Sequence, residues 1–413
     1  MVRPMGSGAR GEGAIVVTPG WSGQKSSNGR PIRLLLAGGG HAHLGVLKSW
    51  IARPPHGIET SLITSERYLI YSGMVPAWIT DPAAAEDLRI DLVSLADRAG
   101  IDCIIGSVVG MDANQREVVL NNGERLSFDL LSIATGGEID TSTLADLGPR
   151  LLPVRPMPDL VRRWPLVRDT ATRTPGFRVA VVGGGAAGVE LALAISSTLA
   201  GSCAAPVMLV SDTEALLPGH SSRARRLAQE RLAHAGVELV EGHASATPDG
   251  LLLDSGRRIP AGCVVAATGT RAPRWLRNSG LQLDGQGFVS VGPDLRSQSH
   301  PHVFAAGDIA SWRDRRGGRT VARSGVHAVH MGPVLAENLR RTLRDAGARL
   351  RVYRPRRRSL YLLSTGDSRA ILSWGSVAMA GRWAQRLKNH IDRRFVREWA
   401  RLGSGAKGMA WSN

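Results

Sequence analysis

The order of apolar and polar positions repeats along this chain. One stretch, RLLLAGGGHAHLGVL, begins at Arg33, and a second, RVAVVGGGAAGVELA, begins at Arg178. Each opens with an apolar run of the length of a buried strand, continues through a glycine turn and enters the apolar spacing of a helix. The repetition predicts two copies of one strand–turn–helix unit.

Both copies continue in the same order. A further apolar run ends in a serine and an acid, at Ser65-Glu66 in the first copy and at Ser211-Asp212 in the second. A turn-rich hairpin segment then leads to a strand that ends in Ala-Thr-Gly, with Gly136 and Gly269 as the last residues. Strands that alternate with helices in this way predict an α/β protein with parallel sheets.

The spacing of the glycines indicates what both turns bind. In a dinucleotide-binding loop the first glycine permits the tight turn, the second admits the pyrophosphate, and the third lets the helix pack on the strand. The second copy has all three, whereas the first has Gly38 and Gly40 but His43 in the third position. The N-terminus of the following helix offers free N–H groups to the phosphates. We expect a dinucleotide at both loops; the alternative for the first loop is an ordinary strand–helix turn.

A third landmark is HPHVFAAGDIA, residues 300–310. Its apolar run predicts an additional strand of the first sheet. Gly307 would permit close approach of a ligand, and Asp308 would stand at the start of a helix, where a carboxylate is favoured and is able to hold a polyol hydroxyl.

Together these features resemble the two-dinucleotide flavoproteins of the pyridine nucleotide–disulfide oxidoreductase superfamily, over about residues 31–340. The resemblance implies two Rossmann-like dinucleotide-binding domains, with an NAD(P)H domain inserted into an FAD domain. It implies that FAD is bound by Gly38, Gly40, His43, Ser65, Glu66, Thr135, Gly136, Gly307 and Asp308. It implies that NAD(P)H is bound by Gly183, Gly185, Gly188, Asp212, Thr268 and Gly269.

The expected domain boundaries follow from these landmarks. They are a disordered tail over 1–29, an FAD-binding domain over 30–150 and 276–340, an NAD(P)H-binding domain over 151–275, and a C-terminal basic region over 341–413. The tail is rich in Gly, Ser and Arg, and its apolar stretch is too short for a secretory signal. The sequence contains no run of about 18 apolar residues, so no membrane span is expected.

Cysteine usage narrows the class. Cys103, Cys203 and Cys263 lie far apart and form no CxxC pair, which disfavours a dithiol centre and a zinc site. Few cysteines without a secretory signal favour a reducing, cytoplasmic compartment.

One segment restricts the resemblance to part of the superfamily. Disulfide reductases carry their pair of redox cysteines where this chain has RYLIYSGMVPAW, residues 67–78, which contains no cysteine. The chain is therefore more similar to type II NADH:quinone oxidoreductases. The segments GGGHAH, YSGMVP, GPVLAENLR and YLLSTGD are similar to the NADH-dehydrogenase-like module associated with selenide water dikinase. A quinone is the expected electron acceptor, while a selenium or sulfur compound and a soluble carrier remain alternatives.

The candidate catalytic residues come from the same resemblance. Glu190 follows the third glycine of the second loop by two positions, which implies a place near the flavin and nicotinamide; the alternative is an ordinary acid in a first helical turn. His327 and His330 occur where the type II enzymes carry two glutamines, and either would serve as a proton donor or as a structural residue. His41 and His43 diverge on a helix start, so no metal site is expected.

The choice between NADH and NADPH depends on the end of the second strand. Asp212 favours NADH, because a carboxylate repels a 2′-phosphate. Arg223, Arg225 and Arg226 follow closely, which leaves NADPH open.

Charge is concentrated at the C-terminus. From Arg340 onward there are 18 Lys and Arg against 4 Asp and Glu, so this segment carries +14 of the formal charge of +17. Basic segments attract anionic lipid or nucleic acid, and the alternative is a solvated surface.

The residues after 354 predict a hairpin and a helix. Two strands over 354–375 are joined by a turn at Thr365-Gly366-Asp367. On the helix of residues 382–402, one apolar stripe combines Trp383, Leu387, Ile391, Phe395 and Trp399. The stripe and its flanking Arg suit a peripheral contact with the inner face of a membrane, and the alternatives are packing on the protein itself or a homodimer. The stripe disfavours the remaining class, a nucleotide-gated binding flavoprotein whose tail engages nucleic acid, because phosphate contacts need no apolar face.

Overall fold

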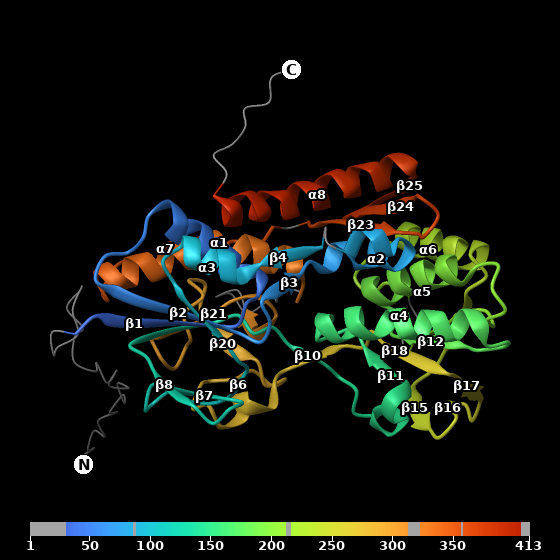
Figure 1. The fold of residues 1–413 in the computed structure, drawn as a ribbon, viewed down its shortest axis with the longest axis horizontal. Coiled ribbons are helices and arrows are strands. Elements are labelled where there is room, and N and C mark those ends of the chain that lie inside the picture. Colours follow the sequence, from blue (N-terminus) through green and yellow to red (C-terminus); the bar gives the residue numbers. More distant parts are fainter. Residues whose placement is uncertain (1–29, 86–87, 212–215, 313–322, 357, 406–413) are drawn as a thin grey trace, which may run out of the picture.

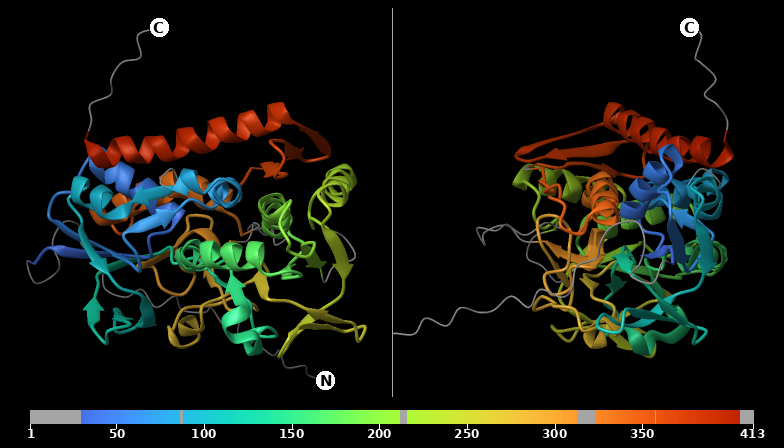
Figure 2. Two further views of the ribbon diagram at one scale, coloured as in Figure 1. Left: turned by 45° about the vertical axis from the view of Figure 1, so that its right-hand side comes forward. Right: turned by 90° about the vertical axis from the view of Figure 1, so that its left-hand side faces the viewer.

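The computed structural model describes residues 30–85, 88–211, 216–312, 323–356 and 358–405. Two parallel five-stranded sheets, each covered by helices, lie side by side (Figure 1). A long helix, α8 (Arg382–Ser404), runs along the top of the molecule in all three ribbon views (Figures 1 and 2). The predicted tail over 1–29 and the predicted nucleotide contact Asp212 lie outside the described residues.

The first sheet contains the first glycine loop. Its strand order is β21-β9-β1-β2-β5, and every neighbouring pair is parallel. The strands are β21 (Val303–Ala305), β9 (Leu130–Ile133), β1 (Ile32–Ala37), β2 (Ile58–Thr64) and β5 (Asp102–Ile105). The glycine loop joins β1 to α1 (His41–Ala52), which packs against α7 (Gly325–Arg344).

The second sheet repeats this arrangement. Its order is β11-β18-β12-β13-β14, again parallel throughout. The strands are β11 (Leu151–Pro153), β18 (Cys263–Ala266), β12 (Val179–Val182), β13 (Met208–Ser211) and β14 (Glu238–Glu241). The second glycine loop joins β12 to α5 (Ala186–Leu199). The order β18-β12-β13-β14 matches β9-β1-β2-β5, so the prediction of two Rossmann-like domains is confirmed.

Each copy also has a small antiparallel sheet before its last strand. These sheets are β6-β7-β8 (Val108–Asp112, Glu117–Leu120, Arg125–Ser127) and β15-β16-β17 (Ala244–Thr247, Gly250–Leu253, Arg258–Pro260). They correspond to the two turn-rich hairpin segments of the sequence. The copies therefore share four parallel strands and a small antiparallel sheet as well as their glycine loops. They differ in the fifth strand, since β21 follows the other strands of its sheet in the chain and β11 precedes those of its sheet.

The chain passes between the domains along one short ribbon. Strand β10 (Glu138–Ile139) leaves the first domain and pairs antiparallel with β19 (Thr270–Arg271), which returns to it. The second sheet is built from strands between Leu151 and Ala266, so it is inserted between β9 and β21 of the first sheet. The described part of the chain also contains β3 (Tyr68–Ile70), α2 (Val75–Thr80), β4 (Arg89–Asp91), α3 (Leu92–Arg98), α4 (Met157–Arg173), α6 (Ser222–His234), β20 (Val289–Val291) and β22 (Ala310–Trp312). Short 3₁₀ segments occur at Ser72–Met74, Pro82–Ala85, Ala145–Arg150, Arg274–Asn278 and Gly307–Ile309.

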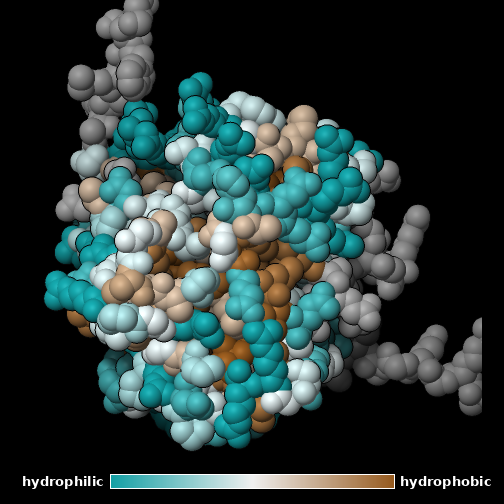
Figure 3. All heavy atoms as spheres, turned by 90° about the vertical axis from the view of Figure 1, so that its right-hand side faces the viewer, coloured by the Kyte–Doolittle hydropathy of each residue, from teal (hydrophilic) through white to brown (hydrophobic). Residues whose placement is uncertain are grey.

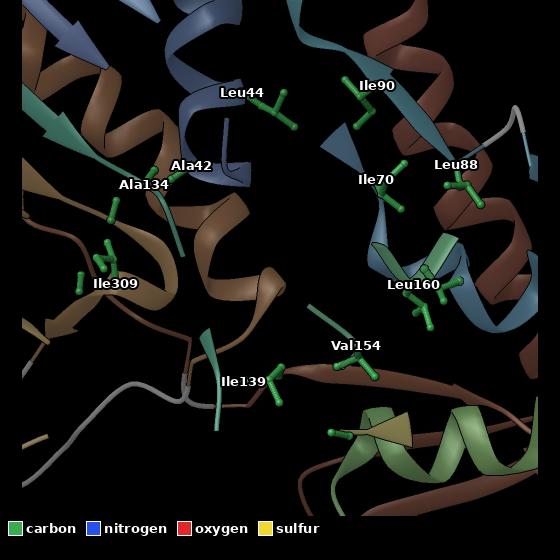
Figure 4. Close-up of a cluster of buried hydrophobic side chains, with 14 of the residues drawn as sticks. Ala42, Leu44, Ile70, Leu88, Ile90, Ala134, Ile139, Val154, Leu160 and Ile309 are labelled. Atoms are coloured by element: carbon green, nitrogen blue, oxygen red, sulfur yellow. The ribbon is translucent and has the colours of Figure 1, made fainter. Parts of the chain in front are cut away.

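Apolar side chains of both domains are buried in a common core. Figure 4 shows part of it, with side chains from both domains that include Ala42 and Leu44 from α1 and Leu160 from α4. Seen from the end that carries the second domain, hydrophilic residues cover much of the surface and hydrophobic atoms are visible between them (Figure 3). None of the helices within the described ranges is long and apolar enough to cross a membrane.

The C-terminal region differs in part from expectation. The predicted hairpin is present as β23 (Leu360–Ser364) and β24 (Ala370–Trp374), but a third strand, β25 (Val377–Gly381), extends it and leads directly into α8. The expected boundary at residue 340 falls inside α7. The expectation that Asp308 begins a helix is wrong: Gly307–Ile309 is a single 3₁₀ turn followed by strand β22.

Helices α1 and α7 cross at two glycines. A Cβ atom placed on Gly45 would lie 2.6 Å from the carbonyl carbon of Gly332, and one placed on Gly332 would lie 2.9 Å from the carbonyl oxygen of Ala42. Backbone atoms cannot move aside as a side chain would, so the two helices approach this closely only because both positions lack a side chain.

We therefore predict that Gly45→Leu lowers the free energy of unfolding by about 2 kcal/mol, although leucine favours helices more than glycine does. Urea unfolding followed by circular dichroism measures the change. Gly285→Ala is the matched control, because a Cβ on this exposed glycine meets no atom within 4 Å. An equal effect of both substitutions would contradict the importance of the crossing.

Candidate functional site

A cavity of about 750 Å³ lies at the carboxyl ends of the first sheet's strands. This is the edge at which open α/β sheets bind their ligands, and the volume suits a large organic ligand. Its lining includes every residue assigned to FAD except His43: Gly38, Gly40, Ser65, Glu66, Thr135, Gly136, Gly307 and Asp308. It also includes Arg155, Met157 and Pro158, which belong to the start of the inserted domain. The structure thus brings the predicted residues together around one space.

The first glycine loop packs tightly on the end of β9. Gly38 has a φ of +98°, and a Cβ there would lie 2.6 Å from the backbone of Thr135. A Cβ on Gly40 would lie 2.2 Å from the carbonyl oxygen of Ala134. Gly40 caps α1 without a side-chain hydrogen bond, so the first amides of the helix remain available beside the cavity. This arrangement suits a pyrophosphate.

His43 lies beneath this loop and does not line the cavity. Its side chain is 1% exposed, and its Nδ1 and Nε2 atoms lie 2.6 Å from the carbonyl oxygen of Gly38 and 2.9 Å from Oγ of Ser132. Burial lowers the pKa of His43 to about 4, against a smaller raising effect of the Gly38 carbonyl. The ring is therefore neutral at pH 7.

Asp308 presents a carboxylate to the cavity. One oxygen, Oδ2, accepts a hydrogen bond of 2.8 Å from the guanidinium of Arg155. The other, Oδ1, is buried and has no hydrogen-bond partner within the described part of the chain. Buried polar atoms are usually satisfied, so this oxygen is suited to accept a hydrogen bond from a bound ligand.

His41 forms the wall between the cavity and α8. Its ring lies 5.9 Å from that of Tyr71 and is stacked 6.3 Å from that of Phe395 on α8. Burial lowers the pKa of His41 to about 4, with a smaller raising effect of Asp308 and a smaller lowering effect of Arg155. Its Nε2 atom is buried without a partner among the residues placed by the structure. A neutral imidazole with an unused nitrogen is thus available to a bound group.

These observations test whether FAD fits the cavity. The helix N-terminus suits the pyrophosphate, Glu66 at the end of β2 suits a ribose hydroxyl, and the unpaired oxygen of Asp308 suits a polyol hydroxyl. The residues present therefore fit the group that the sequence implies.

The second glycine loop has the same geometry on the other sheet. Gly183 has a φ of +128°, and its Cβ would lie 2.2 Å from the carbonyl oxygen of Ala267. Gly185 caps α5, and a Cβ on Gly188 would lie 1.8 Å from the carbonyl oxygen of Gly183. The adjacent Thr268 donates a hydrogen bond of 2.6 Å to the carbonyl of Asp140, and Gly269 follows it. These residues meet at the carboxyl edge of the second sheet, outside the lining of the first cavity.

Glu190 joins the inserted domain to the C-terminal region. Its Oε1 atom accepts a 2.8 Å hydrogen bond from the backbone N–H of Ser364 on β23. Burial raises the pKa of Glu190, and the nearby Lys388 partly opposes the shift. Glu190 does not line the cavity, so its position is that of a partly buried acid between α5, β23 and α8.

Lys388 is the centre of a buried charge cluster on α8. Its Nζ atom donates to Oδ2 of Asp392 at 2.8 Å and to the carbonyl oxygen of Gly73 at 2.6 Å. Tyr71 donates a 3.0 Å hydrogen bond to the other oxygen of Asp392. Burial alone would lower the pKa of Lys388, but the carboxylates of Glu190 and Asp392 outweigh it and raise that pKa. The cluster fixes α8 to the residues that flank the cavity.

The two candidate histidines of α7 lie apart from the cavity lining. His327 is buried, and its Nδ1 atom lies 3.0 Å from the hydroxyl of Tyr353. His330 is half-buried one turn later. Burial lowers the pKa of both imidazoles. The nearby His330 lowers the pKa of His327 further, and the nearby Arg356 lowers that of His330 further. Their helix nevertheless borders the cavity through Gly325 and Ala328.

Sequence reasoning missed four residues of this region: Arg155, Tyr71, Lys388 and Asp392. The last two carried a signal, because opposite charges at positions i and i+4 are able to pair, and Ala384 and Val396 occupy the same helix face. Arg155 and Tyr71 carried none, since only the tertiary fold brings them to the site. Within the described ranges, no group of three His, Cys, Asp or Glu side chains is placed to hold a metal ion.

Comparisons with known proteins agree with this geometry. The family described as "Pyridine nucleotide-disulphide oxidoreductase" matches residues 33–332. An NADH dehydrogenase-like protein of Mycobacterium tuberculosis is 29% identical over 236 residues, which cover 54% of this chain and 59% of that protein. A demethylphylloquinone reductase of Synechocystis is 25% identical over 307 residues, 70% of this chain and 74% of that protein.

A solved structure shows the same fold over most of both chains. The structure of NDH2 from Plasmodium falciparum in complex with NADH has a TM-score of 0.76 and 11% sequence identity, and the match covers 90% of this chain and 98% of that one. The match to the mycobacterial relative spans about three fifths of that relative's length.

The charge cluster leads to a prediction on stability. Lys388→Met leaves Asp392 and Glu190 without their buried cation and should lower the free energy of unfolding by about 3 kcal/mol at pH 8. The loss should be smaller at pH 5: without the cation the pKa of Glu190 rises further, and a carboxyl whose pKa is raised in the folded state gains stability as the pH falls.

Urea unfolding at the two pH values measures both effects. Lys48→Met is the matched control, because Lys48 on α1 pairs with Glu398, which lies on α8 as Lys388 does, but at the exposed surface. That variant should lose less than about 1 kcal/mol. Equal losses for the two lysines, or a larger loss for Lys388→Met at pH 5, would argue against a buried cluster.

Proposed function

The chain belongs to the pyridine nucleotide-disulphide oxidoreductase family, and on this premise we propose that it is an FAD-dependent NAD(P)H dehydrogenase that passes electrons to a quinone or another small acceptor. The observation that supports this most is the cavity itself. One space is bordered by the first glycine loop, by Glu66 and by the unpaired carboxylate oxygen of Asp308, next to the start of the inserted domain.

The chain's own residues have separable tasks in this proposal. The backbone N–H of Gly38 donates to the carbonyl of Ile63, so the amides that follow it in the loop and at the start of α1 hold the FAD pyrophosphate. Glu66 accepts hydrogen bonds from its ribose, and Asp308 holds its polyol chain. Arg155 keeps the carboxylate of Asp308 oriented through their 2.8 Å contact. When bound, FAD accepts hydride from the nicotinamide and supplies electrons to the acceptor.

The nicotinamide nucleotide belongs at the second loop in this proposal. Gly183, Gly185 and Gly188 would admit its pyrophosphate, with Thr268 and Gly269 at the adjoining strand end. NADH is the favoured form because of Asp212, with NADPH as the alternative. Glu190 would lie near the two rings, and its burial, which raises its pKa, favours the protonated form of its carboxyl.

Two observations favour a quinone as acceptor. One relative is named a demethylphylloquinone reductase. The segment that holds the redox cysteines of disulfide reductases forms β3 and α2 here without a cysteine, so electrons would leave the flavin directly. His327 and His330 would supply protons to the reduced acceptor, although the bond of His327 to Tyr353 leaves His330 the freer of the two.

The surface around α8 favours a peripheral membrane contact. Trp374, Val377 and Met379 of the C-terminal sheet are exposed, as are Trp383 and Ile391 of α8 at 46% and 41%. The outward face of α8 carries Arg386, Arg393, Arg394, Arg397 and Arg401. Exposed aromatic and aliphatic side chains beside arginines suit the headgroup region of an anionic bilayer. We place the protein in the cytoplasm, at the inner face of the membrane.

The first test is spectroscopic. The purified protein, reconstituted with FAD, should show flavin absorbance that NADH bleaches under anaerobic conditions and that a short-chain quinone restores. Bleaching without recovery would leave a selenium or sulfur compound or a soluble carrier as acceptor. Absence of flavin binding would contradict the proposal.

Paired loop variants test which nucleotide occupies which loop. Gly40→Val places a side chain against the Ala134 carbonyl and should abolish flavin binding. Gly188→Val collides with Gly183 and should retain the flavin spectrum but lose its bleaching by NADH. The reverse pattern would exchange the two assignments.

The membrane contact predicts lipid-dependent flotation. The protein should float with vesicles that contain phosphatidylglycerol and remain in solution with vesicles of phosphatidylcholine alone, and Ile391→Glu should weaken the association about tenfold. Leu166→Glu is the matched control, because Leu166 is 69% exposed on α4 of the other domain. Dimer dissociation by Ile391→Glu, or salt-sensitive DNA binding without flotation, would assign the surface to those partners instead.

A further inference from the structure

The third loop position is filled differently in the two copies. In the second loop it is Gly188, and a Cβ there would lie only 1.8 Å from the carbonyl oxygen of Gly183, the first glycine. Helix α5 therefore covers this carbonyl so closely that only glycine fits. The same position in the first loop holds His43, so α1 cannot lie as close to the carbonyl of the first glycine, Gly38, as α5 lies to that of Gly183.

In the first loop the corresponding carbonyl receives a hydrogen bond. Nδ1 of His43 lies 2.6 Å from the carbonyl oxygen of Gly38, which only accepts, so Nδ1 carries the proton. Nε2 of the neutral ring then accepts from the Ser132 hydroxyl, 2.9 Å away on β9. Both side chains are buried, at 1% and 0% exposure. The imidazole thus bridges the loop and the sheet on which the loop rests.

The close helix contact that a third glycine usually permits is found elsewhere. Gly45, two residues after His43, meets Gly332 of α7 instead of the loop. Space between α1 and the loop is therefore occupied by the His43 ring, while α1 gains its close packing on its other neighbour.

We propose that His43 is a positioning residue for FAD, which replaces the third glycine by holding the Gly38 carbonyl towards the protein interior through a Ser132–His43–Gly38 bridge. His43 does not line the cavity, so it acts on the cofactor through the shape of the loop. With the carbonyl held in this way, the phosphates meet the N–H groups of the loop and not its oxygen. The inference rests on the proposed binding of FAD at this loop.

Four variants separate the bridge from simple packing. His43→Gly restores the usual glycine but leaves the Gly38 carbonyl and the Ser132 hydroxyl buried without partners. His43→Asn places an amide N–H near the Nδ1 position and retains the bond to Gly38. His43→Gln places its amide near the Nε2 position and reaches only Ser132. Ser132→Ala removes the far end of the bridge alone.

The dissociation constant of FAD, measured by quenching of flavin fluorescence, should follow the bond to Gly38. We expect weakening of about tenfold or more for His43→Gly and His43→Gln, and of about threefold or less for His43→Asn and Ser132→Ala. The affinity for NADH at the second loop should not change. His302→Gly is the control, because His302 is a partly buried imidazole of the same domain that donates to the Ala113 carbonyl away from the cavity. The FAD affinity of this variant should equal that of the wild type.

Hydrogen–deuterium exchange of the FAD-free protein measures the effect of the same bridge on the loop without the cofactor. Amides of residues 38–42 should exchange faster in His43→Gly and His43→Gln than in the wild type and His43→Asn. Wild-type affinity and exchange in His43→Gly, or equal losses in His43→Asn and His43→Gln, would overturn the inference. A wild-type protein that binds no FAD would instead contradict the proposed function, while the exchange data would still decide whether the bridge shapes the loop.

Discussion

The fold depends on how closely two glycine turns approach the strands beside them. Gly38 rests on the backbone of Thr135, and Gly183 rests on that of Ala267, in both cases at distances that exclude any side chain. Each approach fixes the helix that follows, and each helix start then lies at the carboxyl edge of its sheet. The cavity, its carboxylates and the position of α8 are all arranged around the first of these contacts.

A second constraint comes from charge in the interior. Lys388 and Asp392 on α8 are buried together with Tyr71, and Glu190 of the inserted domain lies near enough to raise the pKa of the lysine. Removing one partner of a buried ion pair leaves an uncompensated charge, so each of these groups is tolerated only beside its partners. The cluster therefore fixes α8 in one position, against both the cavity wall and the inserted domain.

Most of the architecture was predictable because the two copies support one another. Two copies of one strand–turn–helix unit followed from glycine spacing and apolar runs that occur twice. The inserted domain and most of the cavity residues were implied by the resemblance that these copies carry, and the order of the strands came only from the structure. The C-terminal helix was harder, since its apolar residues recur every four positions and drift around a helix of 3.6 residues per turn. Trp383 and Ile391 are consequently exposed while Trp399 is buried, and the buried line contains Lys388 and Asp392. The short turn at Asp308 was also missed. A helix follows β1 and β12 directly after the glycine loop, whereas the helix that follows β21 and β22 begins only at Gly325.

The pairing of β10 with β19 has a consequence for how the first sheet tolerates the inserted domain. The strand that leaves the first domain and the strand that returns to it are neighbours, joined through Glu138↔Arg271 and Ile139↔Thr270. More than a hundred residues separate these two strands in the sequence, yet the inserted segment leaves and re-enters the first domain at one place. Loop-closure entropy grows only slowly with length, so an insertion whose ends meet costs its host little. A domain inserted in this way therefore leaves the strand order of the first sheet uninterrupted.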